Sequence, residues 1–439
     1  MIKPAGGWWK NQFQKLPQSI DWMKEKGRII SWAFFDFANT AFSVIIVTVI
    51  YSKYFTNYVA DGRKWIWGLA VSISMILAAL LSPPMGAIAD SSRNRKRFLL
   101  LFTLISVVCT AFMYFVQKGD VILGLLLFVL ANIGFEAGLV FYDAFLPNLT
   151  SKKNYGRVSG YGFAMGYLGA LVVLLIVMFI LPSPAAPTYY FYIRLSFIIA
   201  AFFFLFFSIP LFVFVSEPSV NKLVKKELIR TGIKRSFTTL KSIFVKSKFP
   251  SVKRFLLAFF LYNDAIITII AFASIFATNI LKMTDAEIIY FFVIVQSTAV
   301  AGSFLFGIIS DHIGPKKTIT ITLIIWIGVI LGAFLVQTIA EFYLVGLLAG
   351  LSIGSSQSCS RSLMALLTPK DREAEFFGFY DGLFGKSSAV VGPLFYGIIS
   401  DLSNERVASL AIGLFFIAGL ILLQKVEDPF TKLKLQKSE

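Results

Sequence analysis

Long apolar stretches alternate with short polar segments along the whole chain. Most stretches have 20 or more residues, about the length that an α-helix needs to cross the hydrocarbon core of a bilayer. The pattern predicts an all-α membrane protein with twelve transmembrane helices, over residues 31–58, 65–89, 97–117, 121–147, 156–181, 190–216, 252–281, 286–310, 317–338, 341–367, 374–400 and 405–425.

The longest polar interruption divides these spans into two sets of six. Short patterns repeat across it, since Gly86-Ala-Ile-Ala-Asp90 returns as Gly307-Ile-Ile-Ser-Asp311, 221 positions later. Two six-helix repeats joined by a long loop resemble the major facilitator fold, in which the transport site lies between the halves near mid-membrane. We therefore expect an N-terminal segment, a first half, a helical linker, a second half and a tail, over residues 1–30, 31–216, 217–251, 252–426 and 427–439.

Composition and charge fit a membrane protein. The chain is 57% hydrophobic with a mean hydropathy of +0.77, whereas soluble domains are about 45–50% apolar. The net charge of +17 would suggest nucleic acid binding in a soluble protein, but 32 of the 41 Lys and Arg residues lie on one side of the expected topology. This bias predicts cytoplasmic termini, with a secondary attraction to anionic lipid. We expect a monomer in the plasma (inner) membrane, with membrane lipid and a small-molecule substrate as partners and no nucleic acid.

The first 30 residues carry an apolar helical face rather than the apolar core of a signal peptide. Its members follow one another at spacings of three and four residues: Trp9, Phe13, Leu16, Ile20 and Met23. The spacing predicts an amphipathic helix at the cytoplasmic interface. A disordered tail is the alternative.

Seven of the charged residues inside the predicted spans carry the functional argument. A charge at mid-bilayer costs about 2.5 kcal/mol or more, so such residues face a bundle interior or a water-filled cavity and pair with one another. A chain with seven of them is expected to move a polar solute. Together with polar and aromatic neighbours they form the expected substrate or proton pathway: Asp36, Asn39, Asn132, Glu136, Tyr142, Asp143, Tyr262, Asn263, Asp264, Gln357, Arg361, Asp381 and Lys386.

Three of these residues carry specific hypotheses. Glu136 and Asp143 share one helical face, and in a low-dielectric cavity at least one is expected to titrate near neutrality. Glu136 is the candidate for proton coupling. Asp143 and Arg361 lie 218 positions apart, at equivalent places in the two halves, which predicts an ion pair that closes one side of the cavity. Alternatively, Arg361 binds a carboxylate of the substrate.

The repeated Gly-x-x-x-Asp pattern predicts a gate. A small residue lets two helices approach closely, and an aspartate one turn later accepts a basic partner or caps a neighbouring helix. Ordinary stop-transfer charges are the alternative, although they do not explain the pattern in both halves. The expected cytoplasmic gate, in which Arg93 or Arg95 pairs with Asp90, contains Gly86, Asp90, Arg93, Arg95, Gly307, Asp311 and Lys316.

The sequence offers little to catalysis. The single histidine, His312, stands at the end of a predicted helix, where a structural role is expected. The two cysteines, Cys109 and Cys359, lie inside spans and provide neither a metal site nor an expected disulfide. We expect no enzymatic activity, no cofactor and no metal.

Several segments in both halves resemble the vacuolar effluxer-like family of the major facilitator superfamily. They include Phe34-Phe-Asp36-Phe-Ala-Asn39, Phe141-Tyr-Asp143-Ala-Phe-Leu-Pro147, Ser360-Arg361-Ser362 and Gly378-Phe-Tyr-Asp381. The resemblance implies an alternating-access transporter that exports amino acids or similar small zwitterionic metabolites, with proton coupling left open. The alternatives are a proton-coupled sugar, peptide or drug carrier, or a lipid-handling membrane protein without solute flux.

Overall fold

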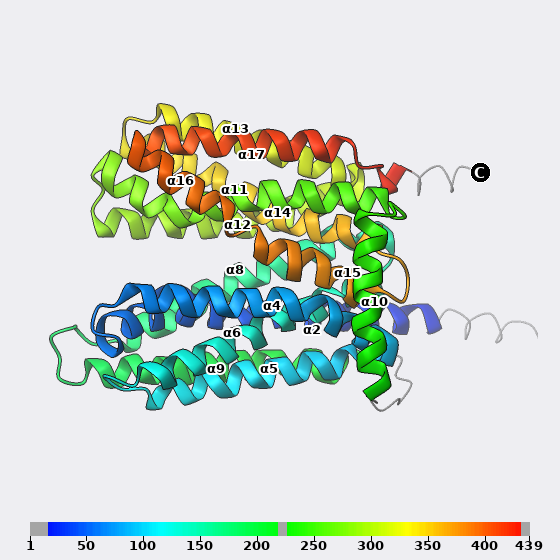
Figure 1. The fold of residues 1–439 in the computed structure, drawn as a ribbon, viewed down its shortest axis with the longest axis horizontal. Coiled ribbons are helices and arrows are strands. Elements are labelled where there is room, and N and C mark those ends of the chain that lie inside the picture. Colours follow the sequence, from blue (N-terminus) through cyan, green and yellow to red (C-terminus); the bar gives the residue numbers. More distant parts are fainter. Residues whose placement is uncertain (1–15, 218–225, 432–439) are drawn as a thin grey trace, which may run out of the picture.

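The computed structural model describes residues 16–217 and 226–431, and within these ranges the regular structure is helical. The helices form two bundles that lie side by side, with the linker helix α10 (Lys226–Phe244) crossing one end of both (Figure 1). We call this end the linker end and the opposite one the open end.

The first bundle contains the N-terminal half of the chain. Its first span joins α2 to two π-helical segments and a short helix, and π segments inside longer helices often occur at functional sites. The elements are α2 (Leu16–Ala41), η1 (Phe42–Val49), α3 (Tyr51–Tyr54), η2 (Phe55–Val59), α4 (Lys64–Ser92), α5 (Arg95–Phe112), η3 (Met113–Phe115), α6 (Val121–Asp143), α7 (Leu146–Leu149), η4 (Lys152–Asn154), α8 (Tyr155–Ile180) and α9 (Tyr189–Phe214).

The second bundle contains the C-terminal half. Its elements are α11 (Pro250–Leu281), α12 (Asp285–Ile313), α13 (Pro315–Leu335), α14 (Ile339–Leu367), α15 (Glu373–Phe377), η5 (Gly378–Gly385), α16 (Val391–Leu402) and α17 (Glu405–Gln424).

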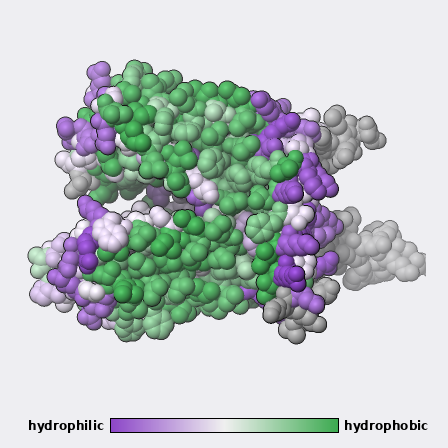
Figure 2. Space-filling view, in the orientation of Figure 1, coloured by the Kyte–Doolittle hydropathy of each residue, from purple (hydrophilic) through white to green (hydrophobic). Residues whose placement is uncertain are grey.

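An apolar belt covers the visible face of both bundles. Figure 2 shows it between two polar ends, as expected for a protein whose long helices face lipid. Within the described ranges, eleven helices are long and apolar enough to cross a membrane. They correspond to eleven of the twelve predicted spans, and the bounds agree within a few residues apart from the first, whose helix α2 begins at Leu16.

The remaining predicted span, 374–400, is not one continuous helix. It consists of α15, the π-helical segment η5 and, after a break, the shorter apolar helix α16. Two side chains of α11 bind this segment. Asn263 donates to the side-chain hydroxyl of Ser388 at 2.7 Å. Both carboxylate oxygens of Asp264 accept from the backbone amide of Gly392, at 2.9 and 2.8 Å. Such partners are needed because an unsatisfied backbone group inside a membrane costs several kcal/mol.

The two other non-spanning predictions have different outcomes. The linker is helical over Lys226–Phe244, as expected. Trp9 and Phe13 of the predicted interfacial helix lie outside the described residues. From Leu16 onward the chain is helical and runs into the first span without a break at residue 30.

Candidate functional site

The aspartate of the first Gly-x-x-x-Asp pattern joins the two halves at the linker end. Asp90, at the end of α4, accepts from the backbone amides of Ala374 and Glu375 at 3.1 and 2.9 Å. These amides begin α15 in the other half, where a negative charge is favourable. Asp90 also pairs with Arg95 at 2.8 Å, and Arg95 in turn contacts Glu373.

The second pattern makes the mirrored contact. Asp311, near the end of α12, accepts from the amides of Gly156 and Arg157 at 2.8 and 3.3 Å, where α8 begins in the N-terminal half. The side chain of Arg157 adds an ion pair at 2.5 Å. Each half therefore caps a helix of the other half. We call the side chains of Asp90, Arg95, Glu373, Asp311 and Arg157 the linker-end gate.

The glycines of both patterns lie where the two halves touch. A Cβ atom on Gly86 would overlap the carbonyl oxygen of Ala374, and one on Gly307 would lie 2.8 Å from the carbonyl oxygen of Gly156. Any larger side chain would force the halves apart at this end.

Two predicted gate residues lie elsewhere. Arg93 ends α4 in a left-handed conformation with φ of 52° and is exposed, so Arg95 and not Arg93 pairs with Asp90. Lys316 does not face the other half: its ammonium binds the carbonyl oxygens of Gln424 and Val426 at 2.9 and 2.6 Å. It sits at the end of α17, where helix carbonyls lack intrahelical partners and attract a cation.

Deeper between the halves, Arg361 of α14 binds two carboxylates of the N-terminal half. Its Nη1 lies 2.8 Å from Asp143 Oδ1 and 3.2 Å from Asp36 Oδ2. We call these three residues the arginine cluster. The predicted Asp143–Arg361 ion pair is therefore present. Arg361 is 1% exposed, and in this conformation protein groups occupy the positions that a substrate carboxylate would need.

Other side chains hold the arginine cluster in place. Ser159 accepts from Arg361 Nε through its hydroxyl at 2.9 Å and from Nη2 through its carbonyl at 2.8 Å. The guanidinium lies over the rings of Trp32 and Phe163, 4.8 and 4.1 Å from their centroids. Tyr142 stacks on Trp32 and donates to Asp36 at 2.7 Å. A planar, hydrogen-bonded arginine between aromatic rings has little freedom to move.

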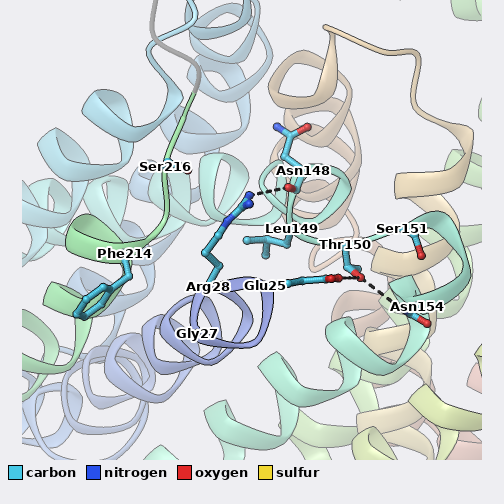
Figure 3. A pocket seen from close by; sticks show the side chains of 10 residues that line it. All are labelled: Glu25, Gly27, Arg28, Asn148, Leu149, Thr150, Ser151, Asn154, Phe214 and Ser216. Carbon is cyan, nitrogen blue, oxygen red and sulfur yellow. Dashed lines mark hydrogen bonds between the residues drawn. The ribbon is translucent and has the colours of Figure 1, made fainter. Parts of the chain in front are cut away.

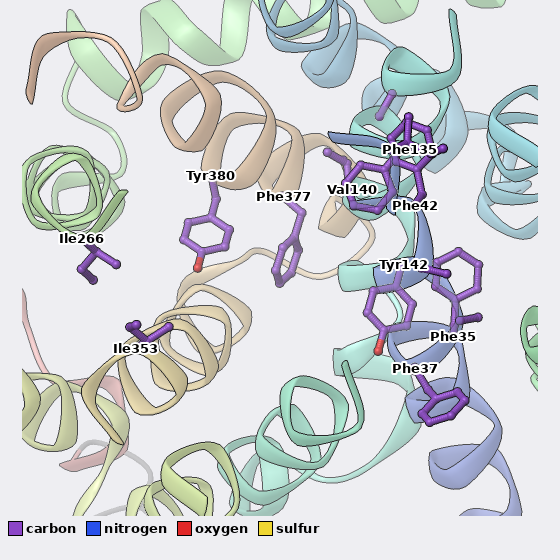
Figure 4. Close-up of a cluster of buried hydrophobic side chains, with 14 of the residues drawn as sticks. Phe35, Phe37, Phe42, Phe135, Val140, Tyr142, Ile266, Ile353, Phe377 and Tyr380 are labelled. Carbon is purple, nitrogen blue, oxygen red and sulfur yellow. The ribbon is translucent and has the colours of Figure 1, made fainter. Parts of the chain in front are cut away.

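An aromatic layer of the C-terminal half faces this region. Figure 4 shows Phe377 and Tyr380 projecting from the α15–η5 segment into the space between the halves, with Tyr142 and Phe35 across from them. Tyr380 packs on Phe259, with ring centroids 4.3 Å apart.

A second charge cluster crosses between the halves about 10 Å along α6 from Asp143, given seven residues at 1.5 Å each. Lys386 contacts Glu136 of the N-terminal half and lies 3.3 Å from Asp381 of its own half. We call these three residues the lysine cluster. The side chains of Lys386 and Asp381 keep 13% and 22% of their surface exposed. Glu136 and Asp143 thus share a helix face, as predicted, but belong to different clusters.

The other predicted pathway residues fall into two groups. Some contact the clusters or link the halves: Asn39 donates to Asp36 at 3.3 Å, and Gln357 accepts from Tyr167 across the halves at 2.6 Å. The rest bond within one half, Asn132 to Ser74, Tyr262 to Ser360, Asn263 to Ser388 and Asp264 to Gly392.

Sequence reasoning missed several residues that bind the gate and clusters. Arg157 and Glu375 have opposite charges at equivalent positions, 218 residues apart, the same signal that predicted the Asp143–Arg361 pair. Ser159 and Phe163 carried no signal, because serine and phenylalanine are common in spans.

A cavity of about 720 Å³ at the linker end lies apart from the clusters. Figure 3 shows it between residues 25–28 of α2 and the segment around α7, where Arg28 donates to the Asn148 carbonyl at 2.9 Å and Thr150 to Glu25 at 2.7 Å. No residue of the predicted pathway lines it.

The space-filling view shows a difference between the two ends of the molecule. Figure 2 shows a hollow between the two halves there, with hydrophilic atoms visible inside it, while the linker end is closed. Two helical bundles that share buried charges, closed at one end and hollow at the other, define a membrane transporter of the major facilitator type.

The comparisons with known proteins agree with this class. The family described as "Vacuole effluxer Atg22 like" matches residues 66–429. The chain belongs to this family.

Two relatives illustrate its range. An uncharacterized MFS-type transporter, YxiO, of Bacillus subtilis (strain 168) is 29% identical, over 93% of this chain and 97% of the relative. Autophagy-related protein 22 of Pichia angusta is 25% identical, over 80% of this chain and 72% of the relative.

Solved structures share the fold. The human organic anion transporter MFSD10 (TETRAN) aligns with a TM-score of 0.74 at 14% identity, covering 91% of this chain and 99% of that one. The transporter FucP in its outward conformation aligns with a TM-score of 0.70 at 13% identity, covering 92% of this chain and 100% of that one.

Proposed function

We propose that this protein exports amino acids or similar small zwitterionic metabolites by alternating access, coupled to proton movement through Glu136. The observation that carries the proposal is the pair of charge clusters between the halves. Each cluster sets two carboxylates against one cation, so each has a formal charge of −1 when every group is ionised.

An uncompensated carboxylate between the halves favours a positive partner. Burying an unpaired charge is costly, and a proton or a substrate ammonium group lowers that cost. An amino acid brings such an ammonium together with a carboxylate that suits Lys386. The lysine cluster has the exposure that contact with a solute requires, since Asp381 and Lys386 are partly accessible.

The orientation of the protein in the membrane rests on the distribution of its basic residues. The linker end carries α10 and the basic segments that the positive-inside rule assigns to the cytoplasm. On this assignment the structure is closed to the cytoplasm and open to the outside, in the plasma (inner) membrane. Export then requires the gate to separate, so that the cytoplasmic side loads substrate.

Charged clusters between the halves favour a polar solute over a lipid. A lipid carrier needs an apolar path between the halves that opens sideways to the bilayer. Arg361 and Lys386, each contacted by two carboxylates, stand between the halves instead. A carrier of sugars or peptides is the second candidate function. The side-chain amides of Asn39 and Gln357, which lie near the clusters, could form hydrogen bonds with such a substrate.

Counterflow in proteoliposomes tests the proposal. Vesicles loaded with an unlabelled amino-acid mixture are placed in traces of labelled amino acids, for wild type, Arg361→Gln and Arg63→Gln, an exposed arginine at the open end. We expect exchange by wild type and Arg63→Gln, and none by Arg361→Gln.

If wild type exchanges no amino acid, the substrate assignment is wrong. The same vesicles, tested with labelled sugars and with a fluorescent phospholipid, then distinguish the two alternatives.

A further inference from the structure

The linker helix α10 presents three different faces. One face is buried against the bundle and carries Gly232, Ser236, Thr239 and Ile243, at spacings of four, three and four residues. A Cβ atom on Gly232 would overlap the side chain of Ile88 in α4. This face fixes α10 to the end of the bundle.

The second face is apolar and uncovered. Ile229, Ile233 and Phe237 follow one another at four-residue spacing and are 41%, 40% and 66% exposed. Because a helix turns once in 3.6 residues, these side chains form one stripe beside the buried face.

The third face is basic. Arg230, Lys234 and Lys241 are all exposed, and each lies within one turn of the apolar stripe. An apolar stripe next to a basic row is typical of helices that lie in the interface of an anionic membrane. Figure 1 shows that α10 lies across the ends of the membrane-spanning helices, as an interfacial helix must.

We propose that Ile229, Ile233 and Phe237 insert into the surface of an anionic lipid leaflet, with Arg230, Lys234 and Lys241 contacting its headgroups. The occupant is lipid because α10 lies across the ends of the membrane-spanning helices and because three cations complement anionic headgroups. The inference does not depend on which solute the protein carries.

The position of α10 couples this contact to the gate. Arg235 donates to Ser91 of the N-terminal half at 3.1 Å and to Glu375 of the C-terminal half at 3.0 Å. Arg372 also binds Glu375, at 2.9 Å, and contacts Thr239 of α10.

Opening the linker end would separate Ser91 from Glu375. Arg235 of α10 could then keep only one of its two hydrogen bonds. A lipid leaflet that holds α10 in its present place therefore favours the closed linker end, and anionic lipid should shift the transporter toward it.

Spin labels test the lipid contact directly. In a full-length background with Cys109→Ala and Cys359→Ala, one label is placed at Ile233→Cys and, as a control, one at Thr231→Cys on the opposite flank. The protein is reconstituted in phosphatidylcholine with or without phosphatidylglycerol. We expect the label at 233 to be shielded from a water-soluble nickel complex and relaxed by oxygen, more strongly with phosphatidylglycerol. The label at 231 should stay accessible to nickel. Equal nickel accessibility at both sites would overturn the proposal.

A charge variant tests the coupling to the gate. The distance between labels at Lys153→Cys and Lys370→Cys, which lie in different halves at the linker end, is measured in both lipids. We expect phosphatidylglycerol to raise the closed population several-fold in the parent and in a control with Lys246→Gln and Lys248→Gln. The combined Arg230→Gln, Lys234→Gln and Lys241→Gln variant should lose this response. A parent that does not respond to phosphatidylglycerol, or a charge variant that responds as the parent does, would contradict the coupling.

Discussion

The arginine cluster and the lysine cluster contain the same number of positive and negative groups but have different surroundings. Each joins the halves through one cation and two carboxylates. In the arginine cluster the cation is 1% exposed, bonded to Ser159 and placed between aromatic rings. In the lysine cluster the cation and one carboxylate are partly exposed.

This difference suggests that the two clusters have different roles in transport. A rigid guanidinium with several fixed partners suits a lock that closes the linker end, because every partner must be lost when the halves separate. A flexible ammonium beside a partly exposed carboxylate suits a site that exchanges partners with a proton or a solute. Breaking each cluster separately tests this assignment.

Arg361→Gln should have the largest effect. It leaves Asp36 and Asp143 without their cation, and removing one partner of a buried ion pair costs about 3–5 kcal/mol, a change of about a hundredfold or more in a conformational equilibrium. We expect counterflow to be lost while the protein is still inserted and purified. Arg361→Lys, which keeps the charge but loses the planar fork, should recover only part of the activity. Transport at the wild-type rate by Arg361→Gln would show that the arginine cluster is not a lock.

Glu136→Gln should change the pH response more than the maximal rate. The variant removes the excess negative charge of the lysine cluster, so no proton is needed to balance it. We expect wild-type counterflow to differ at two pH values on either side of neutrality, and the variant to run at similar rates at both. A variant with the pH profile of the wild type would place proton coupling elsewhere.

Gly86→Ala should weaken the closed linker end without touching either cluster. The added methyl group would overlap the carbonyl oxygen of Ala374, and overpacking of this kind costs about 1–3 kcal/mol. Gly68, on the same helix α4, is the matched control, because a methyl group added there would meet no other atom within 4 Å. We expect about tenfold less of the closed form in Gly86→Ala and no loss in Gly68→Ala, as measured by spin-label distances. Equal behaviour of the two variants would mean that the close contact is not needed.

Asp264→Ala should have the smallest effect, on stability. It removes the cap of α16 and so loosens the segment that follows the lysine cluster. Losing a helix cap costs about 1 kcal/mol, and we expect a small drop in the thermal unfolding midpoint with counterflow retained. Lys118→Ala, which removes an exposed pair with Asp61, serves as the control and should not change the midpoint. If the Asp264→Ala protein is stable but shows no counterflow, Asp264 belongs to the substrate or proton pathway and is more than a helix cap.

The sequence predicted those features that depend on local patterns or on the internal repeat. Hydropathy is a property of consecutive residues, so it located eleven spans. The repeat placed Asp143 opposite Arg361 because two halves related by symmetry bring equivalent positions together. The same relation underlies the matched caps of Asp90 and Asp311.

Features that depend on particular tertiary contacts were not predictable. The Glu136–Lys386 pair joins positions that the repeat does not relate. The break in the eleventh span is bound by Asp264 and Asn263 from another helix. The apolar pattern of residues 374–400 carries no information about those partners, so it predicted one continuous helix. Lys316 resembled a gate residue because its carbonyl partners, at and just after the end of α17, lie more than a hundred positions away.

The central claim is that the arginine cluster holds the linker end closed, and two distances measured in one sample test it most directly. Spin labels at Lys153→Cys and Lys370→Cys report the linker end, and labels at Asp61→Cys and Ser403→Cys report the open end, in wild-type and Arg361→Gln backgrounds without other cysteines. We expect Arg361→Gln to lengthen the first distance and to shorten the second. Unchanged distances at both ends would contradict the claim.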